Sequence, residues 1–350
     1  MEARRVGILG AGAWGSALGK MLAEKGHDVR IWSFEEPVAD EINREHVNSR
    51  YLPEVDLPAS LEAVTTLEDA VSEAEFLIVA IPSLYILNTV KAILPLPNVM
   101  EGKVSIGVVT KGFITTDRGT RLIVETLEDY LPGFYKNSLV YISGPSHAEE
   151  VGRGRLTGLI SASQNPKNSI RFRELMTVDT LKLFSSLDVI GVQVCGAMKN
   201  VIAIAFGMMD ALKELTQAFG DNTESLLLAA GLNEIQTIGT ALGSTHPETF
   251  TSIAGVGDLD VTCRSHYGRN RRFGRSVVLD DVLEPFKDIN ELIASIDTIG
   301  YLPEGVVACR AAQELMQRYN LKLPITGAVY RILNKEANPF DEIRSVLRST

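Results

Sequence analysis

The sequence is poor in the residues that mark several classes of protein. Its 350 residues include three cysteines and five histidines, and 44 acidic side chains outnumber 34 basic ones. The cysteines cannot all pair and lack C-x-x-C spacing, which disfavours a structural disulfide and is typical of a reducing compartment. The histidines are scattered without H-x-H or H-x-x-x-H spacing, so the sequence predicts no metal site.

Positive charge and long apolar runs are also scarce. A formal net charge of −10 argues against general affinity for nucleic acid, whose phosphates favour a basic protein face. The nearest approach to a membrane-spanning run, at residues 201–209, is far shorter than the roughly 20 residues that a span requires. A strand is expected so close to the N-terminus that no signal peptide fits before it. These absences predict a soluble, cytoplasmic protein without a membrane span.

The residues that are present suit a two-domain globular protein. Hydrophobic residues make up 45% of the chain and charged residues 22%, which is enough apolar material for a sizeable core. Apolar runs that predict strands alternate with helical patterns up to residue 193, and only helical patterns follow. The sequence therefore predicts an α/β domain at residues 1–193 and a helical domain at residues 194–350.

The apolar runs of the first part predict a doubly wound parallel sheet. They do not alternate with polar residues, as expected of parallel strands covered on both faces. Strands are expected at residues 6–9, 29–32, 75–82, 104–110, 139–143, 159–163, 181–185 and 189–194. Helices are expected at 37–48, 67–74, 84–94 and 120–131, and later at 195–215, 223–242, 288–295, 306–319, 324–333 and 340–347.

Residues 6–15 predict a dinucleotide-binding loop. A buried strand ends in G-x-G-x-x-G, and a helical pattern follows at once. Gly10 permits the tight turn, Gly12 lets the backbone approach a pyrophosphate, and Gly15 lets helix and strand pack closely. The N–H groups at the helix start would hold the phosphates. Glu35, about 20 residues beyond the last glycine, stands where an acid can bind the adenosine ribose hydroxyls.

Two further loops, at residues 110–112 and 143–146, follow predicted strands. In a doubly wound sheet, ligands bind beyond the carboxyl ends of the strands. Lys111 in the first of these loops is therefore either placed to meet a phosphate or a carbonyl, or is an ordinary surface lysine.

Lys199 lies in an almost wholly apolar helical pattern. It either reaches water from a helix edge or is buried, and burial would lower its pKa and suit it to general acid/base chemistry. Asn200 beside it either binds a substrate hydroxyl or satisfies a nearby backbone group. Asp258 stands at a glycine-flexed turn, where it is either a helix N-cap or a partner of Lys199.

Residues 264–275 carry five arginines in an acidic chain. The cluster is either a solvated charge run, a nucleic-acid patch, or a loop that closes on a small phosphate. Its glycines and Asn270 favour the phosphate loop, since a guanidinium binds phosphate bidentately. The five are Arg264, Arg269, Arg271, Arg272 and Arg275.

Together, these motifs resemble the NAD(P)-dependent glycerol-3-phosphate dehydrogenase family over nearly the whole chain. They are G-A-G-A-W-G at residues 10–15, T-K-G at 110–112, S-G-P-S-H-A-E-E at 143–150, K-N-V-I-A-I at 199–204, G-V-G-D-L-D-V-T-C at 255–263, G-R-N-R-R-F-G at 268–274 and P-E-G at 303–305. The resemblance implies a Rossmann-type domain followed by an all-helical domain like that of 6-phosphogluconate dehydrogenase. It also implies a homodimer that reversibly reduces dihydroxyacetone phosphate to sn-glycerol 3-phosphate for glycerophospholipid synthesis.

The resemblance also implies residue roles. Lys199 would be the proton donor and acceptor, and Asp258 would hold it in place. Substrate contacts are expected, besides Lys199 and Asn200, from Lys111, Gly144, Ser146, Asp258, Gly268, Arg269 and Asn270. Cofactor contacts are expected from Gly10, Gly12, Ala13, Trp14, Gly15, Phe34, Lys111, Ala148, Arg269, Leu302 and Glu304.

The chain departs from the bacterial pattern of the family at three places. Ala13 and Gly268 stand where serine is common, so two hydroxyl contacts are missing. Ser33-Phe34-Glu35-Glu36 stands where bacterial members often carry a basic residue that can meet the 2′-phosphate of NADP. Because acids repel that phosphate, the sequence predicts that NADH is preferred over NADPH.

Two other functions fit the first domain. One is a related two-domain dehydrogenase acting on a hydroxyacid or ketopantoate, although a carboxylate substrate would not require the arginine cluster. The other is a non-catalytic NAD-binding sensor, which would leave Lys199 without a role.

Overall fold

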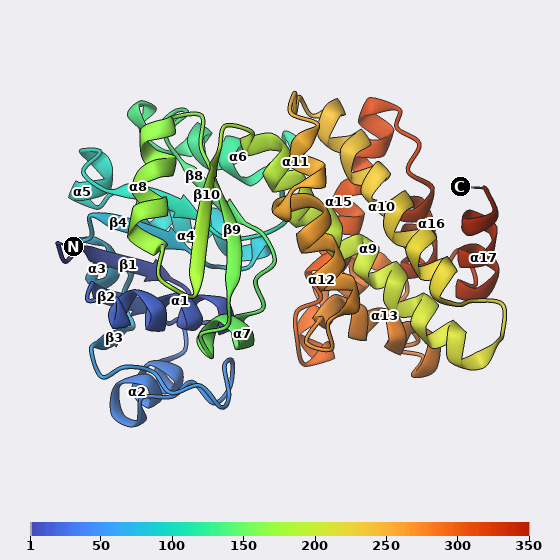
Figure 1. Cartoon of the computed structure of the whole chain (residues 1–350), viewed down its shortest axis with the longest axis horizontal. Helices are drawn as coiled ribbons and strands as arrows, with labels where there is room; N and C mark the ends of the chain where they lie inside the picture. Colours follow the sequence, from blue (N-terminus) through green and yellow to red (C-terminus); the bar gives the residue numbers. More distant parts are fainter. Residues whose placement is uncertain (1, 350) are drawn as a thin grey trace. The chain divides into compact units, whose positions relative to one another are not determined.

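A computed structural model describes residues 2–349, and the chain falls into two units. The first comprises Met1–Lys111 and Ile123–Val189, and the second comprises Gly112–Leu122 and Ile190–Thr350 (Figure 1). The division expected at residue 193 lies inside a helix that begins at Val189. The second unit also includes a short segment from the first half of the sequence.

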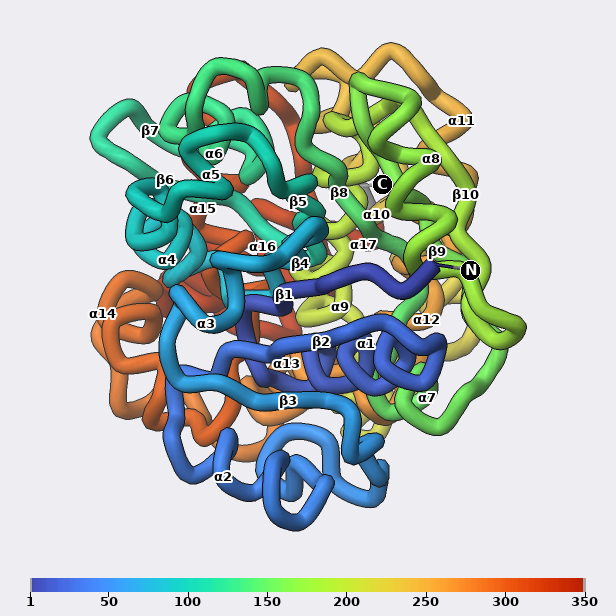
Figure 2. The backbone as a smooth tube through the Cα atoms, turned by 90° about the vertical axis from the view of Figure 1, so that its left-hand side faces the viewer, coloured from blue at the N-terminus to red at the C-terminus, as the bar shows by residue number. Residues whose placement is uncertain are grey.

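The first unit is built on an eight-stranded sheet with the order β10-β9-β8-β5-β4-β1-β2-β3. Figure 2 shows β1, β2 and β3 side by side, with α2 beyond β3. The predicted doubly wound fold is confirmed, because the strand order reverses between β1 and β4. The strands are β1 (Arg5–Leu9), β2 (Asp28–Trp32), β3 (Leu61–Val64), β4 (Phe76–Val79), β5 (Ser105–Val108), β8 (Val140–Ser143), β9 (Thr157–Ala162) and β10 (Leu181–Ser186).

One pair in this sheet is antiparallel, which corrects the expectation of a fully parallel sheet. β9 runs against β8, while β10 is parallel to β9. The helix between β8 and β9, α7 (Ala148–Gly152), is short and packs against α1. A parallel partner needs a crossover that carries the chain back across the sheet. The short connection through α7 makes no such crossover. β9 therefore begins at the edge of the sheet where β8 ends, and runs antiparallel to it.

Helices cover both faces of the sheet. Apolar side chains of α1, α2 and α8 share one buried cluster with the strands, and on the remaining side α3 packs with α4, and α4 with α6. The helices of this unit are α1 (Ala13–Glu24), α2 (Glu36–Glu45), α3 (Leu67–Val71), α4 (Ser83–Ile93), α5 (Pro97–Met100), α6 (Ile123–Tyr130), η1 (Gly133–Tyr135), α7 and α8 (Pro166–Met176).

The second unit is helical around the buried helix α9 (Val189–Leu215). By length and composition α9 resembles a membrane span, but 94% of its most apolar window is buried inside the protein, as in a core helix. The strand expected at residues 189–194 is wrong, because these residues form the first turns of α9. The other helices are α10 (Asp221–Ala241), α11 (Glu248–Thr251), the π-helix η2 (Ile253–Gly257), α12 (Asp258–Arg264), α13 (Arg269–Leu279), α14 (Ile289–Ala294), η3 (Ile296–Ile299), α15 (Glu304–Tyr319), α16 (Pro324–Leu333) and α17 (Pro339–Ser349).

A hairpin of β6 (Phe113–Thr116) and β7 (Gly119–Leu122) also belongs to this second unit. The helix expected at residues 120–131 begins only at Ile123. The hairpin is anchored on α15, where Glu314 accepts hydrogen bonds from the Thr120 backbone N–H at 2.9 Å and its hydroxyl at 2.6 Å. Arg318 donates to the Thr120 carbonyl at 2.9 Å. These polar contacts attach a segment of the first half of the sequence to the helical unit.

Glu234 of α10 caps the beginning of α16 from inside the second unit. Its buried carboxylate accepts hydrogen bonds from the N–H groups of Ile325 at 2.5 Å and Thr326 at 3.0 Å, and from the Thr326 hydroxyl at 2.7 Å. The carboxylate thus satisfies N–H groups that a helix start leaves without partners. Burial raises the pKa of Glu234 despite these bonds, because the charged form loses hydration.

We expect the Glu234→Gln variant to change how stability depends on pH. A carboxyl whose pKa is higher in the folded chain stabilises that chain most below its unfolded pKa, and this contribution falls as the pH rises toward the folded pKa. The free energy of unfolding of wild type, minus that of Glu234→Gln, should therefore decrease as the pH rises from about 4.5. Urea unfolding at a series of pH values measures this difference. A difference that does not change with pH would contradict the prediction.

Candidate active site

Two loops at the carboxyl edge of the sheet come together in the first unit. β5 and β8 are parallel neighbours, so the chain leaves both strands at the same edge. The Lys111 ammonium donates to the Gly144 carbonyl at 3.1 Å and contacts the Ser146 hydroxyl at 3.4 Å. Three of the expected substrate residues are thereby placed within one hydrogen-bonded group.

The glycine loop after β1 has the shape that a dinucleotide requires. A Cβ atom on Gly15 would lie 1.9 Å from the Gly10 carbonyl oxygen, so only glycine permits this approach of helix and strand. A Cβ atom on Gly12, the N-cap residue of α1, would meet no atom within 4 Å. The backbone is therefore open to a phosphate at the positive end of a 12-residue helix. These residues fit a dinucleotide cofactor.

Other expected cofactor residues flank this loop. Ala13 and Trp14 in the first turn of α1 pack against a small apolar cluster that includes Ala148 of α7. Phe34 follows β2, and 87% of its surface is exposed, which leaves an aromatic face available to an adenine ring.

Glu35, which the sequence places at the adenosine ribose, has partners of its own. Arg50 forms an ion pair with the Glu35 carboxylate, and the Tyr51 hydroxyl donates to its other oxygen at 2.5 Å. No sequence pattern indicates Arg50 and Tyr51, because they lie in a loop beyond α2 and no spacing rule connects them to Glu35.

In the second unit, Lys199 and Asp258 form a buried ion pair. Lys199 is 6% exposed and Asp258 is 0% exposed, so the lysine does not reach bulk water from a helix edge. Asp258 is the first residue of α12, and its carboxylate accepts from Lys199 while Gly257 occupies the N-cap position. A buried charge pair at this place suits proton transfer to a bound substrate.

A chain of amide hydrogen bonds lies beside this pair. Asn270 of α13 donates to the Asn200 side-chain oxygen at 2.9 Å and accepts from the Gly305 N–H at 2.9 Å. Both asparagines are buried. The network joins α9, α13 and the start of α15 and fixes how the Asn200 amide is oriented.

Among the five clustered arginines, Arg269 differs from the others. Four of them have partners: Arg264 pairs with Asp260, Arg271 with Asp210 and Arg275 with Glu214, while Arg272 lies 4.1 Å from the centre of the Tyr301 ring. Arg269 is exposed at the start of α13, and no ion pair or hydrogen bond engages its side chain within residues 2–349. Its guanidinium is therefore available to an anion.

The remaining expected site residues belong to the second unit. Gly268 is the buried N-cap residue of α13, and Leu302 and Glu304 lie at the start of α15. They share this unit with Arg269, whereas the glycine loop and Phe34 lie in the first unit. No group of three or more metal-binding side chains gathers anywhere in the described part of the chain.

Comparison with known proteins identifies the family. Residues 5–169 match the model of the NAD-dependent glycerol-3-phosphate dehydrogenase N-terminus, and residues 188–344 match that of its C-terminus. The chain belongs to this family. The resemblance that rested on seven motifs is therefore confirmed across both parts of the chain.

Relatives within the glycerol-3-phosphate dehydrogenase family cover nearly the full length. The chain is 54% identical over 350 residues to "Glycerol-3-phosphate dehydrogenase [NAD(P)+]" of Treponema denticola, covering 98% of each protein. It is 52% identical over 340 residues to the protein of the same name from Treponema pallidum, covering 95% of this chain and 96% of that protein. The crystal structure of glycerol-3-phosphate dehydrogenase from Coxiella burnetii superposes with a TM-score of 0.85 at 32% identity, and covers 99% of both chains.

A solved structure from outside the glycerol-3-phosphate dehydrogenase family shares only the fold. A 2-dehydropantoate 2-reductase from Enterococcus faecalis matches with a TM-score of 0.52 at 15% identity. The expectation of a Rossmann-type unit and a helical unit is confirmed. The alternative assignment to a ketopantoate-type enzyme is not favoured.

Proposed function

We propose that this chain is an oxidoreductase that reversibly reduces dihydroxyacetone phosphate to sn-glycerol 3-phosphate with NAD(P)H. The observation that carries the proposal is the buried Lys199–Asp258 pair, in the same unit as Arg269, whose side chain has no ion-pair or hydrogen-bond partner within residues 2–349. The first offers a proton and the second offers a phosphate anchor. Independent support comes from the 54% identity, over 98% of both chains, to the Treponema denticola protein named "Glycerol-3-phosphate dehydrogenase [NAD(P)+]".

Lys199 would act on the substrate oxygen. When bound, the nicotinamide supplies a hydride to the ketone carbon, and negative charge then develops on the oxygen. The Lys199 ammonium stabilises this charge and donates its proton to the oxygen. In the oxidative direction the neutral amine takes the proton back. Asp258 holds the ammonium in position and is a positioning residue in this scheme.

Arg269 would anchor the phosphate group, which is joined to the reacting carbonyl carbon through one methylene group and the ester oxygen. Bidentate binding there fixes the orientation of the ketone toward Lys199. Further substrate contacts are proposed from Lys111, Gly144, Ser146, Asn200, Gly268 and Asn270. Cofactor contacts are proposed from Gly10, Gly12, Ala13, Trp14, Gly15, Phe34, Lys111, Ala148, Arg269, Leu302 and Glu304.

Glu35 supports a preference for NADH. Its carboxylate follows β2 at the place where an acid meets the ribose hydroxyls, and it can accept a hydrogen bond from an unphosphorylated ribose without giving up its ion pair with Arg50. We expect the kcat/KM for NADH to exceed that for NADPH, measured as initial rates of dihydroxyacetone phosphate reduction. A clear advantage for NADPH would contradict this preference.

The same assay separates the alternative functions. Ketopantoate and a small 2-keto acid are offered in place of dihydroxyacetone phosphate, at equal concentration. Rapid turnover of the phosphate ester alone supports the proposal, and turnover of a keto acid alone would contradict it. Tight NADH binding without any turnover would point to a sensor. The proposal also includes the oligomeric state, the compartment and the metabolic role. The chain would form a homodimer in the cytoplasm, and its product would supply phospholipid synthesis.

A further inference from the structure

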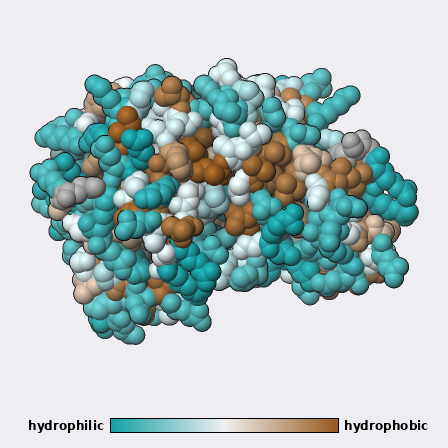
Figure 3. Space-filling model, viewed as in Figure 1, coloured by the Kyte–Doolittle hydropathy of each residue, from teal (hydrophilic) through white to brown (hydrophobic). Residues whose placement is uncertain are grey.

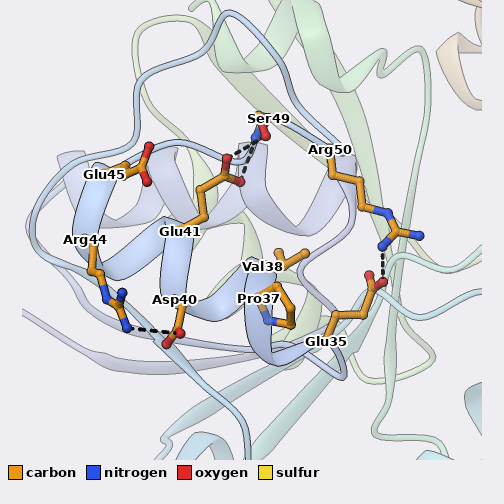
Figure 4. A pocket seen from close by; sticks show the side chains of 9 residues that line it. All are labelled: Glu35, Pro37, Val38, Asp40, Glu41, Arg44, Glu45, Ser49 and Arg50. Atoms are coloured by element: carbon orange, nitrogen blue, oxygen red, sulfur yellow. Dashed lines mark hydrogen bonds and ion pairs between the residues drawn. The ribbon is translucent and has the colours of Figure 1, made fainter.

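A charged groove lies next to Glu35 in the first unit. It is lined by side chains of α2 and of the loop that follows it, among them Glu35, Glu41, Arg44 and Arg50 (Figure 4). Figure 3 shows mainly hydrophilic residues over this lower-left part of the first unit. Such a surface suits a charged ligand group better than an apolar partner.

Arg50 is the cation of this groove that faces Glu35. Its Nη1 atom pairs with one oxygen of the Glu35 carboxylate, and the Tyr51 hydroxyl binds the other oxygen. The Arg50 side chain is 63% exposed, and its guanidinium carbon lies 5.2 Å from the centre of the Tyr51 ring. A guanidinium carries five N–H donors, so one carboxylate contact leaves others directed to solvent.

This pairing changes what Glu35 does to an approaching phosphate. An unpaired carboxylate repels a 2′-phosphate, whereas a carboxylate held by an arginine carries its own compensating charge. In doubly wound folds, an acid after the second strand binds the 2′-hydroxyl of NAD, and a nearby arginine accommodates the 2′-phosphate of NADP. Glu35 and Arg50 are an acid and an arginine of these two kinds, and here they lie in direct contact after β2.

We propose that Arg50 is a specificity-determining residue, which binds the 2′-phosphate of NADP(H) by exchanging its ion pair with Glu35. The inference rests on the proposed function, because it assumes that the dinucleotide lies along the carboxyl edge of β1 and β2. With NAD(H), Arg50 stays on Glu35, and the carboxylate accepts a hydrogen bond from the ribose. With NADP(H), the guanidinium turns to the phosphate and offers it charge-assisted hydrogen bonds.

Arg44 provides a matched control. It lines the same groove and carries the same charge, but it pairs with Asp40 at 3.2 Å, one turn earlier in α2. Figure 4 shows Arg44 and Asp40 at the opposite end of the groove from Glu35 and Arg50. A substitution of Arg44 therefore removes one positive charge from the groove and leaves the Glu35 pair intact.

The test measures binding without turnover. Calorimetry with adenosine 5′-monophosphate and adenosine 2′,5′-bisphosphate isolates the 2′-phosphate, since the two probes differ in that group alone. We expect Arg50→Gln to weaken the bisphosphate about tenfold or more, as the loss of a charge-assisted contact implies, and the monophosphate about twofold or less. Glu35→Gln should strengthen the bisphosphate relative to the monophosphate. Arg44→Gln should change the ratio of the two dissociation constants by about twofold or less, through screened charge alone.

Each outcome bears on a different claim. Equal weakening of both probes by Arg50→Gln, with a lower melting temperature, would show that Arg50 only holds the loop to α2 and would overturn the inference. Equal changes in the ratio for Arg50→Gln and Arg44→Gln would also overturn it, because general charge would then explain the effect. If neither probe binds the wild-type protein, the dinucleotide site itself is wrong, which is a failure of the proposed function.

Discussion

Replacing Lys199 with methionine should abolish dihydroxyacetone phosphate reduction while the protein still binds its cofactor. A positioned general acid contributes about 10²–10⁴-fold to a rate, and the ammonium also stabilises the developing oxyanion, so we expect kcat to fall by at least about 10³-fold. NADH fluorescence titration of the variant should give a dissociation constant close to that of wild type, because the glycine loop lies in the other unit.

The Lys199→Met change should also destabilise the fold, and this effect must be separated from the loss of catalysis. Removing one partner of a buried ion pair typically costs about 3–5 kcal/mol, since the Asp258 carboxylate would lose its counter-ion inside the second unit. The double variant Lys199→Met/Asp258→Asn removes the stranded charge and should recover much of that stability without recovering activity. A double variant that regained activity, or a single variant within about tenfold of wild type, would show that Lys199 is not the proton donor.

The second large effect is expected at Arg269. Each hydrogen bond to a charged group contributes about 1.5–3 kcal/mol, so losing a bidentate phosphate contact should lower kcat/KM by roughly 10²–10⁴-fold. We expect this loss for Arg269→Gln with dihydroxyacetone phosphate. At saturating NADH, the slow reduction of unphosphorylated dihydroxyacetone should be the same for wild type and variant. That substrate has no group for the arginine to hold, and saturation removes the effect of losing the cofactor contact proposed for Arg269.

Arg275→Gln is the matched control for Arg269. The residue lies in the same helix, α13, and its guanidinium already pairs with Glu214 at 2.8 Å. It should retain nearly all activity with the phosphate ester. If Arg275→Gln and Arg269→Gln lowered kcat/KM equally, or if Arg269→Gln also slowed reduction of dihydroxyacetone at saturating NADH, the arginine would not be a specific phosphate anchor.

Local chemistry explains why so much of the fold could be predicted from the sequence. The strand that ends at Leu9, the glycine turn and α1 follow one another directly, and each is specified by nearby residues. The sequence predicts a strand where α9 makes its first turns, because a valine-rich run has the same composition in a buried strand and in a buried helix. Burial on all sides of α9 removes the periodicity that would have distinguished them.

The hairpin at residues 113–122 illustrates a second limit. Its two strands are four residues each, and it depends on Glu314 and Arg318, which lie nearly 200 residues later in the chain. No local pattern reports such a contact. The direction of β9 cannot be predicted from a local pattern either. It depends on whether the connection from β8 crosses back over the sheet, and not on the composition of the strand.

For the candidate site, too, the motifs predict which residues take part, whereas only the fold shows which of them are in contact. The motifs indicate Lys199 and Asp258, and the resemblance implies that they act together, but the two are separated by 59 residues and only the fold shows that they form a buried ion pair. The resemblance implies a role for Arg269 alone, but the composition of the cluster does not distinguish the five arginines, because the difference depends on which of them already have partners. No local pattern indicates the Glu35–Arg50 pair either, because it too depends on which side chains the fold brings together.

The most direct test of the account is the stoichiometry of the reaction. Purified protein is supplied with limiting dihydroxyacetone phosphate and excess NADH, and the NADH oxidised and the glycerol 3-phosphate formed are both quantified. We predict that each molecule of ketone consumed oxidises one molecule of NADH and yields one molecule of sn-glycerol 3-phosphate. Bound NADH that is not oxidised when the ketone is added, or is oxidised without formation of glycerol 3-phosphate, would contradict the assignment.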